Sequence, residues 1–125
     1  MKLIRNLLRH KFFITSAIFI TFFIAYLSLI KIPSSKVSIA NIDKIYHLIA
    51  YFTLAIFWLF SFYKRKKLKN IIVTLCVLYG IIIEILQDKF TAYRTGDYKD
   101  VIANTLGVLL ALVMFNLILK KNVVN

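Results

Sequence analysis

The stretch from Glu84 to Gly107 holds most of the side chains in this sequence that could carry out chemistry. The chain has five acidic residues, and four of them lie in this stretch. Its carboxylate, amide and guanidinium side chains are those of Glu84, Gln87, Asp88, Arg94, Asp97, Asp100 and Asn104. Long apolar runs flank the stretch, and a polar group among apolar neighbours costs free energy unless it has a partner. This concentration of polar side chains therefore predicts a functional site.

A second polar group lies at the start of an earlier apolar run. Asp43 is the fifth acidic residue, Lys44 follows it, and His47 lies four positions after Asp43. Positions four apart share one face of a helix, so the Asp43 carboxylate could orient the His47 ring. An imidazole beside a carboxylate is typical of general acid–base and metal sites. We expect this group to join the Glu84–Gly107 stretch in one site.

The composition places this site in a membrane. The 125 residues suit one domain, but 61% hydrophobic residues and a mean hydropathy of +0.80 exceed what a soluble domain of this size can bury. The net charge of +12 would favour nucleic acid in a soluble protein. Here the basic residues lie mostly beside apolar runs, which indicates membrane topology and anionic lipid and argues against a nucleic-acid partner. The single cysteine, Cys76, can form no intrachain disulfide.

Four apolar runs predict four transmembrane helices, over residues 12–30, 45–63, 71–87 and 101–119. The expected fold class is an all-α, four-helix transmembrane bundle. Residues 1–11 form a basic cytoplasmic arm, residues 12–121 form one transmembrane domain, and residues 122–125 form a tail. A cleaved signal peptide is the alternative for the first run, but that run is longer than a signal-peptide core of about 7–15 residues.

The distribution of basic residues predicts the orientation of the bundle. Eleven of the 17 Lys and Arg residues lie in the N-terminal arm, in the 64–69 run and at the C-terminal end. Basic residues favour the cytoplasmic side, so we expect both termini and the 64–69 run to be cytoplasmic. The two polar groups then lie at the extracytoplasmic face of the cytoplasmic (inner or plasma) membrane.

Each of the last three runs carries one stripe of polar and small residues at helical spacing. The stripes are Asp43, His47 and Tyr51; Cys76, Gly80, Glu84 and Gln87; and Asp100, Asn104, Gly107 and Ala111. Polar stripes of membrane helices face the bundle interior, and small residues let helix backbones approach closely. The sequence therefore predicts one pocket with three walls, open to the outer leaflet.

Three segments together resemble the signature of VanZ-like membrane proteins. They are DKIYHLIAY at 43–51, EILQ at 84–87 and YRTGDYKDVIANTLG at 93–107. In that family an Asp-Lys-x-x-His segment opens one helix, Glu-x-x-Gln closes the next, and Arg-x-x-Asp-x-x-Asp-x-x-x-Asn-x-x-Gly opens the last. The resemblance implies a multi-pass protein of the bacterial cell envelope. The family is named for a protein associated with resistance to the glycopeptide antibiotic teicoplanin.

Glu84 and His47 are the candidate catalytic residues. A carboxylate about one turn inside the membrane needs a partner or a proton, so Glu84 could serve as a general acid or base, or as a ligand. The alternative for Glu84 is a structural hydrogen bond to Asn104 or His47 that holds the helices together. His47 could be a base, a metal ligand or a hydrogen-bonded brace.

The other polar side chains are candidates for binding. The ligand-binding candidates are Asp43, Lys44, Gln87, Arg94, Asp97, Asp100 and Asn104. A divalent cation is the possible cofactor, because hard cations take several oxygen ligands, and the metal candidates are Asp43, Glu84, Asp97 and Asp100. Helix capping is the alternative for Asp97. Arg94 could contact a phosphate or carboxylate, or form a salt bridge to Asp97 or Asp100. Lys44 could act like Arg94 or reach the membrane interface.

These candidates are compatible with three functions. The first is recognition of an envelope lipid or glycolipid headgroup, or of an amphiphilic glycopeptide antibiotic, in the outward-facing pocket. The second is an intramembrane hydrolase or transferase that acts on an envelope lipid through Glu84, His47 and the aspartates. The third is a structural or assembly partner whose polar core only holds helices together. We favour the first function, with membrane lipids as the expected partners.

Overall fold

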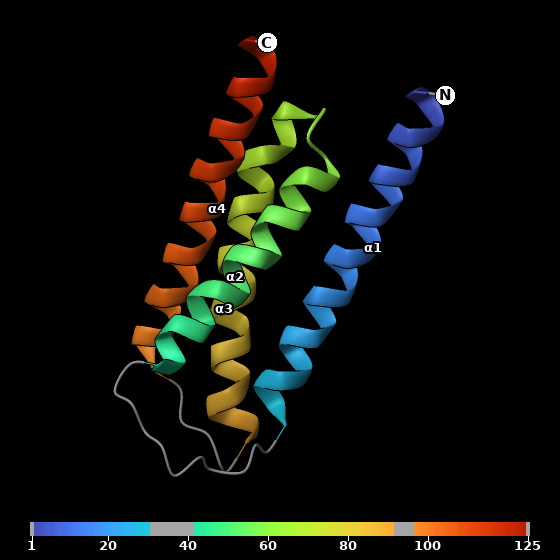
Figure 1. Cartoon of the computed structure of the whole chain (residues 1–125). Coiled ribbons are helices and arrows are strands. Elements are labelled where there is room, and N and C mark those ends of the chain that lie inside the picture. Colours follow the sequence, from blue (N-terminus) through green and yellow to red (C-terminus); the bar gives the residue numbers. More distant parts are fainter. Residues whose placement is uncertain (1, 31–41, 92–96, 125) are drawn as a thin grey trace.

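The chain forms four long helices in a computed structural model, which describes residues 2–30, 42–91 and 97–124. The helices are α1 (Lys2–Leu29), α2 (Ile42–Ser61), α3 (Lys69–Phe90) and α4 (Tyr98–Val124), and the 3₁₀ turn η1 (Lys66–Leu68) precedes α3 (Figure 1). All four are long and apolar enough to cross a membrane. The predicted all-α class with four membrane-spanning helices is confirmed, and the protein is a multi-pass membrane protein.

Most helix ends lie beyond the apolar runs from which the helices were predicted, although α2 ends at Ser61, two residues before the predicted end at residue 63. The N-terminal arm and the first apolar run form one continuous helix of 28 residues. Likewise, α3 continues to Phe90, beyond the predicted end at residue 87, and α4 begins at Tyr98, before the predicted start at residue 101. The polar residues in these added turns are therefore helical. Hydropathy marks only the length that lies in lipid, whereas the backbone hydrogen bonds of a helix continue through polar residues until a cap or breaker.

The helix ends divide into two groups at opposite ends of the bundle. Both termini and the turn between α2 and α3 lie at one end, here called the basic end (Figure 1). The ends of α1 and α3 and the starts of α2 and α4 lie at the other, here called the polar end. The three segments that carry most of the basic residues therefore share one end, as the topology prediction requires.

The crossing of α2 and α4 is the most extensive helix contact among the described residues, and Gly107 allows the two backbones to approach closely. A Cβ atom added to Gly107 would lie 2.3 Å from the backbone oxygen of Leu48 in α2. Ala103, Val108 and Ala111 on the same side of α4 are buried. This confirms that the small residues of the fourth helix allow close backbone approach.

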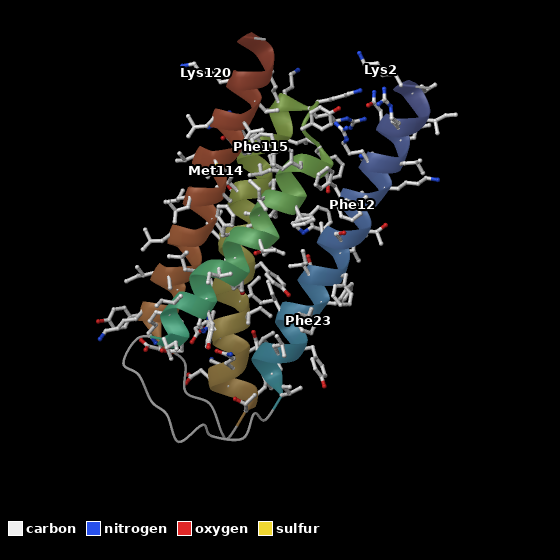
Figure 2. All side chains as sticks on the ribbon, in the orientation of Figure 1. Lys2, Phe12, Phe23, Met114, Phe115 and Lys120 are labelled. Carbon is white, nitrogen blue, oxygen red and sulfur yellow. The ribbon has the colours of Figure 1, made fainter. Side chains whose placement is uncertain are left out.

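Large apolar side chains cover the outside of the bundle (Figure 2). Phe12 and Phe23 on α1 and Met114 on α4 are exposed, while Phe115 is buried against the other helices. An outer surface of this kind matches a lipid environment and would be insoluble in water.

Candidate functional site

The polar end gathers side chains from α2, α3 and α4 into one cluster. The first two turns of α2 supply Asp43, Lys44 and His47, the end of α3 supplies Glu84 and Gln87, and the start of α4 supplies Asp97, Asp100 and Asn104. The structure thus brings together eight of the nine side chains that the sequence singled out. The ninth, Arg94, lies outside the described residues.

Lys44 is the centre of the charged part of this cluster. Its Nζ atom lies 2.8 Å from Asp43 Oδ2, 3.0 Å from Asp97 Oδ2 and 2.6 Å from Asp100 Oδ1. Three carboxylates around one ammonium leave the local charge negative. Lys44 is therefore already neutralised and is poorly placed to attract an anionic headgroup by itself.

His47 connects α2 to α4 through two contacts. Its Nδ1 atom is 3.0 Å from Asn104 Oδ1, and because an amide oxygen only accepts, Nδ1 carries the hydrogen and donates. The other ring nitrogen, Nε2, lies 3.6 Å from Asp100 Oδ2. That distance is too long for a hydrogen bond. In the neutral ring, Nε2 thus presents a free lone pair towards a carboxylate.

Glu84 is the most deeply buried acid, with 5% of its surface exposed. Its Oε1 atom accepts a hydrogen bond of 2.8 Å from the backbone N–H of Asp97, and this bond joins α3 to the start of α4. Its Oε2 atom has no hydrogen-bond partner in the described part of the chain. The structural bond expected from Glu84 to Asn104 or His47 is replaced by this backbone contact, since Asn104 and His47 bond to each other.

Asp97 caps α4, as the alternative reading of this residue predicted. Its Oδ1 atom accepts a 2.9 Å hydrogen bond from the backbone N–H of Lys99, inside the first turn of the helix. That bond and the Lys44 ammonium hold the pKa of Asp97 below its usual value. Its carboxylate is thus committed to capping and ion pairing.

The first helix contributes contacts that the sequence stripes did not reveal. Gln87 donates a 2.9 Å hydrogen bond to the backbone oxygen of Ser28, and Trp58 donates one of the same length to Thr21 Oγ1. Tyr79 donates to the backbone oxygen of Thr21. Thr21 and Ser28 are seven residues apart and share one face of α1. The acceptors for Tyr79 and Gln87 are backbone oxygens, for which side-chain spacing gives no signal.

A cavity of about 440 Å³ lies beside the cluster, between α1, α2 and α3. Its polar lining is Ser28, Asp43, His47, Tyr51 and Gln87, and its apolar lining is Ile24, Leu27 and Ala50 with the Tyr46 ring. The Tyr51 hydroxyl is buried and has no hydrogen-bond partner among the residues described. The cavity thus combines polar and apolar walls, which suits an amphiphilic ligand.

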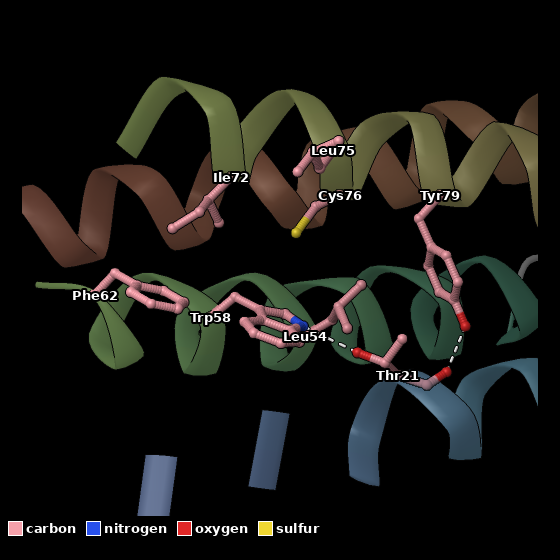
Figure 3. A pocket seen from close by; sticks show the side chains of 8 residues that line it. All are labelled: Thr21, Leu54, Trp58, Phe62, Ile72, Leu75, Cys76 and Tyr79. Carbon is pink, nitrogen blue, oxygen red and sulfur yellow. Dashed lines mark hydrogen bonds between the residues drawn. The ribbon is translucent and has the colours of Figure 1, made fainter. Parts of the chain in front are cut away.

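A second cavity, of about 290 Å³, lies further along the same three helices. Figure 3 shows Thr21 at its edge, bonded to Trp58 and Tyr79, with Leu54, Ile72 and Cys76 around it. Thr21 is about one turn of α1 from Ile24, and Leu54 is one turn of α2 from Tyr51, so the apolar cavity continues the line of the polar one. Together they follow the contact between α1 and the other helices.

His47, Glu84 and Asp100 form the group with metal-ligand character among the described residues. One ligand atom of each lies within 4.8 Å of the others. The metal candidates Asp43 and Asp97 direct their carboxylates to Lys44. The geometry therefore favours His47 as a metal ligand over these two acids.

Comparison with known proteins identifies the family of the chain. The VanZ/LLP1 family profile matches residues 4–119. An uncharacterized protein of Schizosaccharomyces pombe is 36% identical over 74 residues, which are 58% of this chain and 45% of that protein. The chain thus spans about half the length of this curated relative. No solved structure matches.

The profile match covers α2 and α3 entirely, most of α1 and α4, and every described residue of the polar cluster. The chain belongs to the VanZ/LLP1 family.

Proposed function

We propose that this protein binds an amphiphile of the cell envelope, with the headgroup in the 440 Å³ cavity and the apolar chain along α1 towards the 290 Å³ cavity. The observation that carries the proposal is the alignment of these two cavities, one partly polar and the other lined almost wholly by apolar and aromatic side chains. A ligand with a polar head and an apolar tail matches that order. We place the polar end at the extracytoplasmic surface of a bacterial cytoplasmic membrane, on the basis of the basic residues at the opposite end.

The charges support a headgroup rich in hydroxyl or amino groups. Asp43 offers carboxylate oxygens at the cavity wall, while Lys44 is occupied by three carboxylates. Hydroxyl and amine donors pair with such acceptors, whereas a phosphate would face net negative charge. Glycolipids and amphiphilic glycopeptide antibiotics such as teicoplanin carry groups of this kind, and we propose this class over simple anionic lipids.

Binding to reconstituted protein tests the proposal. A fluorescent galactosyl diacylglycerol should bind protein in nanodiscs more tightly than the same diacylglycerol without sugar. Replacing Asp43 by Asn and Gln87 by Leu removes a carboxylate charge from the cavity wall and a hydrogen bond to α1. The double variant should bind the glycolipid at least tenfold more weakly, and teicoplanin serves as a second probe.

Changes at the basic end provide the matched control for this experiment. Lys64→Gln with Lys66→Gln alters two charges far from the cavity and should leave glycolipid binding unchanged. Equal affinity for the lipids with and without sugar would contradict the proposal, as would equal loss of binding in both double variants.

An intramembrane hydrolase or transferase that acts on an envelope lipid is the second candidate. The observation that favours it is the lone pair of His47 Nε2 facing Asp100, with the buried Glu84 carboxylate beside them. These groups could take up and return a proton during ester or phosphoester cleavage. Turnover of a lipid-linked substrate by purified protein, lost in Glu84→Gln, would support this activity. Absence of turnover across the major classes of envelope lipid would count against it.

A further inference from the structure

We propose that His47, Glu84 and Asp100 bind one first-row transition-metal dication, of which Zn²⁺ and Mn²⁺ fit best. The three side chains come from α2, α3 and α4, and one ligand atom of each lies within 4.8 Å of the others. Imidazole suits Zn²⁺, and carboxylates suit both Zn²⁺ and Mn²⁺. This site goes beyond the proposed amphiphile binding, because the ion binds whether or not an amphiphile is present.

The histidine is prepared for metal binding by its neighbour on α4. Nδ1–H donates to Asn104 Oδ1 at 3.0 Å, so the hydrogen lies on that nitrogen and Nε2 keeps its lone pair. Histidine ligands of metals commonly donate their second ring N–H to an oxygen, which fixes the tautomer and the ring orientation. Asn104 is 2% exposed, so this bond is shielded from water.

Asp100 is oriented in the same manner, by Lys44. Its Oδ1 atom is 2.6 Å from Lys44 Nζ, while its Oδ2 atom faces His47 Nε2 at 3.6 Å. In the tautomer set by Asn104, His47 Nε2 and Asp100 Oδ2 both carry a lone pair that faces the other atom. Two such lone pairs repel each other unless a proton or a cation lies between them.

Glu84 supplies the observation that most directly indicates a missing positive charge. The residue is 5% exposed, and Oε1 is held by the backbone N–H of Asp97. Oε2 is buried and has no hydrogen-bond partner within the described ranges. A buried carboxylate oxygen without a donor destabilises the fold, and a metal ion removes that cost.

In His47 and Glu84, one polar atom is held by a hydrogen bond and another is not. In Asp100, Oδ1 pairs with Lys44, and Oδ2 faces His47. Two donors on one Zn²⁺ ion, each at about 2.1 Å, lie at most about 4.2 Å apart. The observed spread of up to 4.8 Å is slightly wider, so small side-chain rotations close the site. Three protein ligands leave a fourth position for water or for an oxygen of a ligand in the adjoining cavity, whose wall includes His47.

Metal analysis of the purified, untagged protein tests this inference. Protein in detergent is stripped with EDTA, exchanged into buffer and titrated with ZnCl₂ or MnCl₂ in a calorimeter, and bound metal is counted by mass spectrometry. We expect one ion per chain. His47→Ala and Asp100→Asn should each weaken binding at least tenfold. His10→Ala changes the other histidine, at the basic end, and should bind like the parent.

The Glu84→Gln variant distinguishes a lost metal ligand from misfolding as the cause of weaker binding. The amide oxygen can still accept from Asp97, so this variant should keep its helical circular dichroism while its metal affinity falls at least tenfold. Co²⁺ provides a second readout: the parent should give weak visible bands without thiolate charge transfer, and these bands should change in His47→Ala. The inference is overturned if the parent retains no ion, if Glu84→Gln binds as the parent does, or if His10→Ala loses the ion equally. A proton shared between Glu84 and Asp100 would then be the explanation for the cluster.

Discussion

The two ends of the bundle differ in the charge of their polar residues and in how deeply these residues are buried. At the polar end, Glu84, Asp100 and Asn104 are buried and contact side chains or backbone of other helices. At the basic end, the cations from Lys64 to Lys67 are exposed, and Lys64, Arg65 and Lys66 line an open cavity of about 610 Å³. Buried groups from separate helices need each other, whereas exposed cations need only water or lipid headgroups. The two ends therefore differ in what their polar residues depend on: partners from other helices at the polar end, and water or lipid headgroups at the basic end.

The crossing of α2 and α4 near the polar end should be the part of the bundle most sensitive to substitution. Gly107→Ala places a Cβ atom 2.3 Å from the Leu48 carbonyl oxygen, and backbone cannot move aside as a side chain can. We expect a loss of about 3 kcal/mol in the free energy of unfolding, seen as a lower melting temperature in detergent. Gly80→Ala is the matched control, because its Cβ would meet side-chain atoms at 3.2 Å and should cost about 1 kcal/mol or less. Equal losses would contradict this description of the crossing.

The two ends can be compared with one pair of asparagine substitutions on α4. Asn104→Leu leaves the N–H of His47 without its acceptor and should cost about 2 kcal/mol. Asn116→Leu removes an exposed bond of 3.3 Å from Lys69 and should change stability by less than about 0.5 kcal/mol. Chemical denaturation in mixed micelles measures both. A larger effect at Asn116 would reverse the assignment of the two ends.

The cap of α4 predicts a dependence on pH. The pKa of Asp97 is lowered in the folded protein, so its stabilising contribution is fully present above the ordinary aspartate pKa and is lost as pH falls through the lower folded value. Between pH 6 and pH 3, the melting temperature of the parent should therefore fall further than that of the Asp97→Asn variant. Parallel curves for the two proteins would show that the cap does not contribute through its charge.

The basic end should tolerate substitution with the smallest effect on folding. Lys64→Gln, Arg65→Gln and Lys66→Gln together remove three exposed cations and should leave the melting temperature within about two degrees of the parent. Retention on vesicles that contain anionic lipid should fall, by about 1 kcal/mol for each cation near the surface. Reporter fusions at both termini measure the orientation, which we expect to be cytoplasmic for each. A large loss of stability would assign a structural role to this end.

Much of this fold follows from patterns within single helices. Four apolar runs gave four helices, and the stripes through Glu84 and Asn104 placed the polar residues of each helix on inward faces. What a single-helix pattern cannot give is the pairing between helices. His47 could bond Glu84, Asp100 or Asn104 with equal plausibility from spacing alone, and only the relative rotation of α2 and α4 selects Asn104 for Nδ1. The partner of Glu84 is a backbone N–H, which no side-chain pattern encodes.

The contribution of α1 was missed for a related reason. Its polar residues, Thr21 and Ser28, are ordinary in a membrane helix, and their backbone oxygens act as the acceptors from Tyr79 and Gln87. A residue's carbonyl group is the same for every residue type, so the sequence carries no signal for this use. The fourth wall of the cavity could be found only from the packing of α1 against α2 and α3.

The two histidines allow the most direct test of the claim that the polar end is the ligand site. His47 lies in the polar cluster and His10 lies at the basic end, and the chain has no other histidine. Nitrogen-15 spectra of the labelled rings can be followed while galactosyl diacylglycerol is added to the protein in nanodiscs. We predict that the His47 signals shift with a saturable dependence on glycolipid while those of His10 stay in place. Unchanged His47 signals, or equal shifts at both histidines, would contradict the assignment of the site to the polar end.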